Sequence, residues 1–237
     1  MPVFRPIRRL RLPRTRLGTR IFRPGIGNPI FLRGLSNFAA GSGASSATTF
    51  SLTPTGQQQD DWLVIFVVTV GGAATITNTA GGLTEITGQL TQGATTTVSL
   101  WKKKCGAGES GTTYTWTVAT GRRWAGIVTC WGGADPTDVV DGANVSSEGA
   151  NAQQIDHNSL TPGAAFDWHI LGTASNTAAP DDAAITFTQP ASYVELAEAV
   201  SAHATLANAR AALSVRELPD TSAIGVQTVS IIGGVNQ

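Results

Sequence analysis

Cysteine is nearly absent from this chain, since Cys105 and Cys130 are the only two among 237 residues. Two cysteines are too few for a disulfide scaffold, and their spacing does not match that of a zinc site. We therefore expect two buried free thiols, with a single bridge between them as the alternative.

Long hydrophobic runs are lacking as well. The longest runs from Trp62 to Val70, about half of the ~20 residues that a helical membrane span requires. No signal-peptide hydrophobic region follows the N-terminus. We therefore expect no membrane partner, and a soluble protein that is made in the cytoplasm.

Acidic residues are missing from the first 34 positions, which hold nine arginines. The rest of the chain has seven basic residues against all sixteen acids, a formal charge of −9, although the net charge of the whole chain is zero. The sequence therefore combines a basic N-terminal arm with an acidic body.

The arm also holds five prolines, which remove backbone donors and disfavour helix in the residues before them. An extended conformation is expected, and apolar residues that recur between the arginines indicate docking onto other subunits. We predict an arm over residues 1–36, a Gly/Ser/Ala linker over 37–46 and a folded domain over 47–237. The predicted partner-binding residues of the arm are Phe4, Arg5, Arg8, Arg9, Arg11, Arg14, Arg16, Arg20, Phe22 and Arg23.

Strand patterns follow one another closely in the predicted domain. "ATTFSLT" (47–53) and "TYTWTVA" (113–119) alternate with period two, which is typical of half-buried strands. The continuous apolar run 62–70 indicates a central strand covered on both faces. A hairpin is predicted around "TAGG" (79–82). Further strands are expected at 95–104, 124–131, 165–172, 184–189, 193–200, 209–217 and 224–234.

A helix competes with strands at one place only, residues 193–213, where Ala, Leu and Glu favour it; we take strand-turn-strand as the better interpretation. Many closely spaced strands without βαβ alternation predict an all-β fold, an antiparallel β-sandwich. The jelly roll is the specific choice, with the extended basic arm attached.

Residues that could bind metal are few. His157, His169 and His203 lie far apart and lack a metal-binding spacing. In "ADPTDVVDGA", three aspartates lie three apart, where carboxylates can converge on Ca²⁺. Asp-Pro and Asp-Gly are also ordinary turn sequences, and we favour the turn. No metal or other cofactor is therefore expected.

Catalytic motifs are missing too, because neither a GxSxG nor a GxxxxGK[ST] sequence occurs. A glycosidase needs two carboxylates across a cleft, and Asp167, Glu195 and Glu198 are the candidates on predicted strands. We expect no enzymatic activity and assign no catalytic residues.

Six tryptophans lie on or beside predicted strands. Such rings can form a carbohydrate-binding platform, but over so many strands they more often fill a core or a subunit interface. "WKKK" (101–104) and "GRRW" (121–124) place basic residues beside tryptophans. These charges can contact an anionic partner or simply be solvated, and solvation is the more common outcome.

One stretch carries a resemblance to a known family. The sequence "DDWLVIFVVTVGG…TITNTAGGLTEIT…TTTVSLWKKKCGAGESGTTYTWTV…RRWAGIVTCWGGADPTDVVDG", from 60 to about 142, resembles β-sandwich modules of tailed-bacteriophage structural proteins. In those modules a strand, a hairpin, a "TYTWT" strand pair and a "DPT" segment follow in this order. "TAGGLTEI" departs from them where the family usually has Pro and Trp. The resemblance implies a virion component, of the head or of the tail, and brings no catalytic residues with it.

These observations lead to one leading hypothesis, a capsid decoration (cement) protein of a virion. It is expected to be a homo-oligomer, with a trimer among the expected assemblies, and its arm is expected to lie on other virion proteins. A minor tail protein whose sandwich binds a host glycan is the alternative. Nucleic acid binding by the arginines is disfavoured, because the arm lacks lysine and is joined to an acidic body. A carbohydrate-active enzyme is the outsider from a different class.

Overall fold

The computed structural model describes the following parts of the chain: residues 30–33, 39–92, 95–134, 137–140, 142–147, 168–177, 193–201, 208–217 and 228–233. Within these ranges the chain forms strands and no helix. The strands are β1 (Phe31–Leu32), β2 (Ala39–Leu52), β3 (Trp62–Val70), β4 (Thr77–Ala80), β5 (Thr84–Glu85), β6 (Leu90–Gln92), β7 (Thr96–Lys104), β8 (Tyr114–Gly132), β9 (Gly142–Ser147), β10 (Trp168–Thr177), β11 (Val194–Val200), β12 (Asn208–Glu217) and β13 (Thr228–Gly233).

An eight-stranded sheet is built around β3 and β8. Its order is β1–β8–β3–β7–β5, with β2 and β4 also paired to β8 and β6 paired to β7. All of these pairs are antiparallel. Every residue of β3 is buried, because β7 and β8 flank the strand and side chains cover both of its faces. The prediction of a central, doubly covered strand at 62–70 is confirmed.

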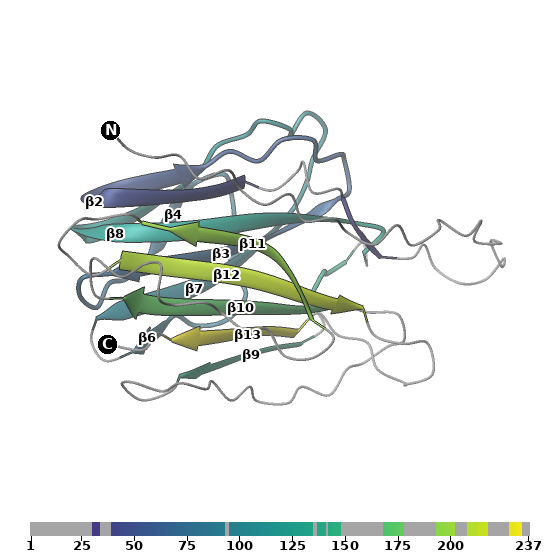
Figure 1. Ribbon diagram of the computed structural model, residues 1–237. Coiled ribbons are helices and arrows are strands. Elements are labelled where there is room, and N and C mark those ends of the chain that lie inside the picture. The colour runs from purple at the N-terminus through teal and green to yellow at the C-terminus, as the bar shows by residue number, and fades with distance from the viewer. Residues whose placement is uncertain are drawn as a thin grey trace, which may run out of the picture.

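A second sheet of five strands, in the order β11–β12–β10–β13–β9, lies in front of the larger one in Figure 1. Its β11–β12 and β10–β12 pairs are antiparallel, whereas β13 runs parallel to both β10 and β9. The predicted β-sandwich is confirmed. The smaller sheet is mixed, however, and so differs from the fully antiparallel sheets of a jelly roll.

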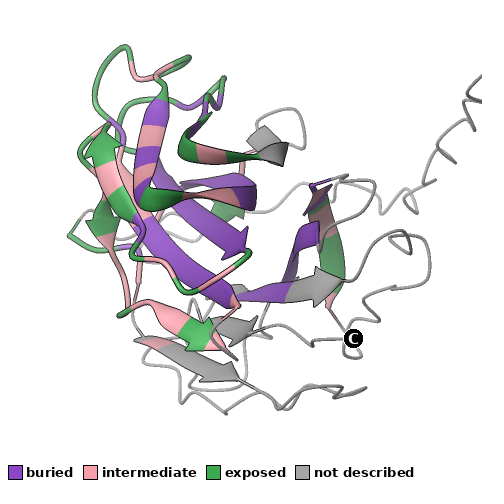
Figure 2. Ribbon diagram, turned by 90° about the vertical axis from the view of Figure 1, so that its left-hand side faces the viewer, coloured by how far each residue is buried: buried purple, intermediate pink, exposed green. Residues whose placement is uncertain are grey.

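The main hydrophobic core fills the space between the two sheets. Phe66 and Ile127 of the larger sheet and Ile170 and Leu213 of the smaller one belong to it. Figure 2 shows that long stretches of the strands are buried. Gly172 lets the sheets approach, since a Cβ there would lie 3.3 Å from the Phe66 ring. Each large apolar side chain buried in this way stabilises the fold by about 1.5–3 kcal/mol.

A second core covers the opposite face of β3. The first half of β8 and the end of β2 pair with each other and place Phe50 and Trp116 over Ile65 and Val67 of β3. Phe50 stacks on Trp116 at 6.0 Å and on Trp124 at 5.0 Å between ring centroids. The alternation predicted for 47–53 and 113–119 is thereby confirmed, because the apolar positions point into this core and the Thr and Ser positions point outwards.

The predicted linker is the main departure from the sequence-based expectation. Residues 39–46 are the first part of β2, and Ala39–Gly43 pair with residues 124–128 of β8. Small residues suit this edge because the Trp124 indole lies against the backbone, where a Cβ on Gly43 would be 2.3 Å from its Nε1. Composition alone indicated flexibility, whereas pairing with β8 and packing against the indole set the conformation.

Two further predictions are wrong in detail. The strands expected at 113–119 and 124–131 are one strand, β8, because the residues between them stay extended and pair with β2 and β3. The predicted hairpin around "TAGG" does not form either. The chain turns at Gly81 and Gly82, both with positive φ, but β4 pairs with β8 and β5 with β7.

Other predictions agree with the structure. Residues 194–200 and 208–217 are strands, which confirms strand-turn-strand over helix in this region. Both thiols are buried and free. Trp62, Trp101, Trp116, Trp124 and Trp131 are buried core residues. The predicted strand 184–189 lies outside the described residues. In the part of the chain that the structure describes, no helix is long and apolar enough to cross a membrane.

Candidate functional site: the root of the arm

The arm reaches the described structure at Ile30–Arg33, which we call the arm root. The ten arm residues predicted to bind partners, from Phe4 to Arg23, lie outside the described residues. Within the arm root, β1 pairs with the last two residues of β8, Phe31 opposite Gly132 and Leu32 opposite Trp131. The last part of the predicted arm is therefore a strand of the sandwich itself.

The Phe31 ring packs directly against Gly132. A Cβ at this position would lie 2.4 Å from Cζ of the Phe31 ring and 3.0 Å from a guanidinium nitrogen of Arg33, so a larger residue requires both side chains to move from these positions. The Arg33 guanidinium lies over the Phe31 ring, 5.1 Å from its centroid. Phe31 nevertheless stays 43% exposed, so the apolar contact covers only part of its ring.

Arg33 anchors the arm root through a buried carboxylate. Its Nη2 donates to Oδ1 of Asp61 at 2.6 Å, and its Nε lies 2.5 Å from Oδ2. The Asp61 side chain is only 3% exposed. It also accepts a hydrogen bond from the Gln58 N–H at 2.7 Å and one from the Cys130 thiol at 3.4 Å. Charged hydrogen bonds of this kind are about twice as strong as neutral ones.

The two cysteines lie beside this ion pair on opposite sides of β3. The Cys105 N–H donates to the carbonyl of Asp61 at 2.7 Å, whereas Cys130 of β8 lies opposite Leu63. Two strand spacings of ~4.8 Å separate them, which is more than a disulfide can span. Burial, with Glu109 and Asp61 nearby, raises the pKa of Cys105 to about 12, and burial also raises that of Cys130. Both thiols are therefore protonated and unreactive at neutral pH.

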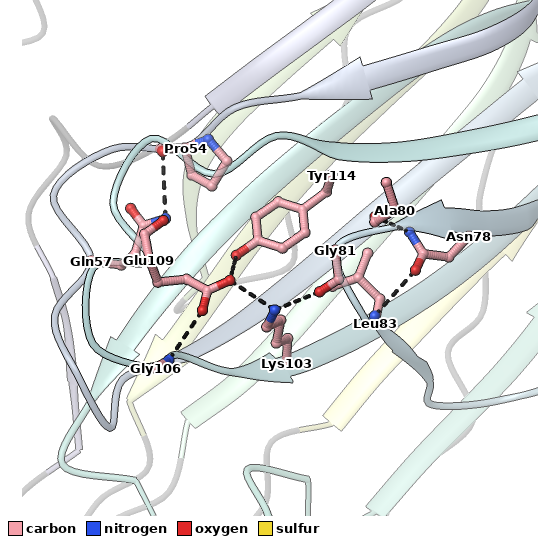
Figure 3. Close-up of polar contacts among 10 residues, drawn as sticks. All are labelled: Pro54, Gln57, Asn78, Ala80, Gly81, Leu83, Lys103, Gly106, Glu109 and Tyr114. Atoms are coloured by element: carbon pink, nitrogen blue, oxygen red, sulfur yellow. Dashed lines mark hydrogen bonds and ion pairs between the residues drawn. The ribbon is translucent and has the colours of Figure 1, made fainter.

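A second charged network continues from Cys105 along the same end of the sandwich (Figure 3). Tyr114 donates to Oε1 of Glu109 at 2.9 Å, Lys103 forms an ion pair with the same oxygen at 2.8 Å, and the Gly106 N–H donates to Oε2 at 3.1 Å. Lys103 also donates to the carbonyl of Gly81 at 2.5 Å. Glu109 thus joins the 105–113 loop to β7, to β8 and to the turn after β4.

The same contacts shift the pKa values of Glu109 and Tyr114. Burial alone raises the pKa of Glu109, but the hydrogen bonds from Lys103, Gly106 and Tyr114 outweigh it and hold this pKa below its ordinary value. Burial and the hydrogen bond to Glu109 raise the pKa of Tyr114. At neutral pH the carboxylate is charged and paired, and the phenol is neutral. The network therefore stabilises the loops and leaves no activated nucleophile.

The "WKKK" lysines are paired with acids. Lys103 binds Glu109 as described, Lys104 lies 3.2 Å from an oxygen of Asp60, and Lys102 contacts both oxygens of Asp138 at 2.5 and 2.6 Å. Each of the three lysines therefore has an acidic partner within the chain.

Asp138 is held as part of a turn. It accepts a hydrogen bond from the Val140 N–H in addition to its ion pair with Lys102. Burial raises its pKa, but these contacts outweigh that effect and lower it. The other two aspartates of the calcium alternative, Asp135 and Asp141, lie outside the described residues. Among the described residues, no group of three or more His, Cys, Asp or Glu side chains could hold a metal ion.

Of the remaining candidates, Glu195 and Glu198 lie within the described residues. Glu195 and Glu198 lie on β11, where Glu198 forms an ion pair with Arg210 of β12. Asp167 lies outside the described residues, as do His157 and His203, and only the backbone of His169 is described, in β10. In "GRRW", Arg122 donates to the carbonyls of Gly72, Ala73 and Gly121.

The arm root and the Glu109 network are what sequence reasoning missed. Asp61 precedes the apolar run and Arg33 lies near the end of the predicted arm, and neither residue was assigned to a site from the sequence. The available signal was the Asp60-Asp61 pair directly before a fully buried strand, where a charged residue at the strand end needs a partner. Comparisons with protein-family models, with curated proteins and with solved structures gave no match for this chain.

Proposed function

We propose that this protein is a non-enzymatic structural component of a tailed-phage virion, a capsid decoration protein that its N-terminal arm anchors to neighbouring subunits. The observation that carries this proposal is the arm root. β1 and the Arg33–Asp61 ion pair fix the end of the arm to the body. A fixed end favours a tether between subunits, because fewer residues lose conformational freedom when the arm binds a neighbour.

Charge supports the same proposal. The first 34 residues hold nine arginines and the rest of the chain has a formal charge of −9. Arg33 is the arginine of this set that lies within the described residues, and its partner is a carboxylate. The other arm arginines are proposed to meet carboxylates on the major capsid protein or on further copies of this chain. The virion is the proposed location, after synthesis in the host cytoplasm.

The chemistry of the body also fits a structural role. Raised pKa values keep the Cys105 and Cys130 thiols and the Tyr114 phenol protonated. The carboxylates at this end of the sandwich are paired with basic side chains. The resemblance of residues 60–142 to phage sandwich modules points in the same direction.

Sedimentation with capsids of the parent phage that lack this protein tests the proposal. The full-length protein is expected to sediment with the capsids. Two variants are expected to stay in the supernatant, one without residues 1–29 and a full-length one with Arg8, Arg9, Arg11, Arg14 and Arg16 changed to Glu. Lys104→Gln, which removes an exposed charge of the body, is the matched control and should bind like the parent.

Undiminished binding of both arm variants would refute the anchoring role. The number of copies per purified virion then separates head from tail, because decoration requires copies in proportion to the capsid subunits. A few copies per particle would instead favour the minor tail protein.

A further inference from the structure

The slot that receives the arm root is built by the body alone. We define the slot by two residues, Gly132, which contacts Phe31, and Asp61, whose carboxylate binds Arg33. The Gln58 N–H and the Cys130 thiol, which both belong to the body, also donate to this carboxylate. A buried carboxylate without a cation is strongly unfavourable. The slot therefore requires an arginine, but nothing in it requires that this arginine come from the same chain.

The chain between β1 and β2 is longer than docking within one chain needs. The Arg33 N–H bonds to the carbonyl of Cys130, and Ala39 lies opposite Val128. Only Thr129 separates these two β8 positions, so one residue would complete a continuous edge strand. The sequence provides five, residues 34–38. Six steps between consecutive residues reach ~20 Å, whereas the two steps of a continuous strand cover ~7 Å.

We infer that the slot at Gly132 and Asp61 is a strand-exchange site, which accepts β1 and Arg33 from a second copy of this chain. The contacts are the same within one chain and between two, so exchange costs little, and the surplus residues supply the reach. This inference rests on the proposed role of the arm as a tether between subunits. It gives the homo-oligomer a defined contact, in which each copy contributes an arginine to its partner's buried carboxylate.

Mixing two single variants tests the exchange directly. Phe31→Cys and Gly132→Cys face each other across β1 and β8, where opposite Cα atoms are ~4.5–5.5 Å apart, within reach of a disulfide. The two full-length proteins are mixed, incubated and mildly oxidised. The expected product on a non-reducing gel is a linked pair of twice the 24.5 kDa chain mass. Neither variant alone should give this band. The parent, whose own thiols are buried, is the control that shows whether Cys105 or Cys130 forms linked pairs.

The double variant Phe31→Cys/Gly132→Cys shows whether the geometry closes a disulfide at all. If it closes within one chain and the mixed single variants stay unlinked, the inference is wrong. If it does not close, light scattering of the parent and of Gly132→Ala decides. A Cβ there displaces the ring of a docked Phe31, so an oligomeric parent and a more weakly associating Gly132→Ala support exchange. A monomeric parent, or an oligomer that Gly132→Ala leaves intact, overturns it.

These measurements use purified protein without capsids, so they are independent of the capsid-binding test. Loss of capsid binding with intact exchange would overturn the proposed function alone. Capsid binding without exchange would overturn only the inference about the second copy.

Discussion

Asp61 is the residue on which the most contacts at the arm root converge. Changing it to Asn keeps its shape but removes the charge that Arg33 and the Gln58 N–H bind. Breaking a buried ion pair by neutralising one partner typically costs 3–5 kcal/mol. Because Arg33 is 22% exposed and can recover some hydration, we expect Asp61→Asn to lower the free energy of unfolding by about 2–3 kcal/mol, measured by urea denaturation.

The matched control is the neighbouring residue, Asp60. It pairs with Lys104 at the surface, where its side chain is 68% exposed, and exposed pairs contribute about 0–1 kcal/mol. Asp60 has a φ of 68°, which Asn tolerates as well, so Asp60→Asn changes the charge without straining the backbone. Equal losses in the two variants would contradict the importance assigned to the buried pair.

Glu109 gives the folded protein a dependence on acid pH. Its pKa in the folded state lies below the ordinary value of 4.5, so folding favours the charged form. This contribution to stability is complete above the unfolded-state pKa and is lost as the pH falls through the lower, folded-state pKa. We expect Glu109→Gln to flatten the fall in the free energy of unfolding below about pH 4.5, as measured by urea titrations at several pH values.

Part of the acid dependence should remain in the Glu109→Gln variant. The pKa of Asp138 is also lowered by its contacts, and this residue belongs to a separate ion pair with Lys102. The free energy of unfolding of the double variant Glu109→Gln/Asp138→Asn is expected to fall less steeply at acid pH than that of either single variant. A pH profile of Glu109→Gln that matches the parent would contradict the assigned role.

At the scale of single residues, the candidate site was only partly readable from the sequence. The buried thiols and the core tryptophans follow from residue type, because such side chains are unfavourable in water. The Arg33–Asp61 pair does not follow, since 28 positions separate the two residues. Only the register of β1 on β8 brings them together, and no local pattern encodes that register.

At the scale of elements, strands were predictable where one face or both are buried. Period-two alternation located the end of β2 and the start of β8, and a continuous apolar run located β3. The first half of β2 was missed because Ala, Gly and Ser carry no periodic signal, and its strand conformation depends on pairing with β8. The prediction that β4 and β5 pair with each other in one hairpin was wrong although a local signal was present. The local turn signal was correct, but long-range pairing sent the two strands to different neighbours.

At the scale of the whole molecule, β3 belongs to both hydrophobic cores. Val68 lies in the core between the sheets, and Val67 lies in the core on the outer face. Both side chains are fully buried. Neither core can persist once this strand is lost, so the two sheets should unfold as one cooperative unit. The sandwich would then behave as a rigid body at the end of its arm, as the proposed decoration role requires.

Alanine at each position of this pair tests that coupling. Val67→Ala and Val68→Ala remove the same two methyl groups from opposite faces of β3, and each is expected to lower the free energy of unfolding by about 1–3 kcal/mol. Trp101, Trp116 and Trp124 lie in the outer core, and Trp62 and Trp131 lie in the core between the sheets, so tryptophan fluorescence follows both cores. Far-ultraviolet circular dichroism follows both sheets. The two signals should give one coincident urea transition in the parent and in both variants, because one shared strand stabilises both cores. Two separate transitions, of which Val67→Ala shifts only one and Val68→Ala only the other, would mean that the outer layer unfolds independently of the sandwich.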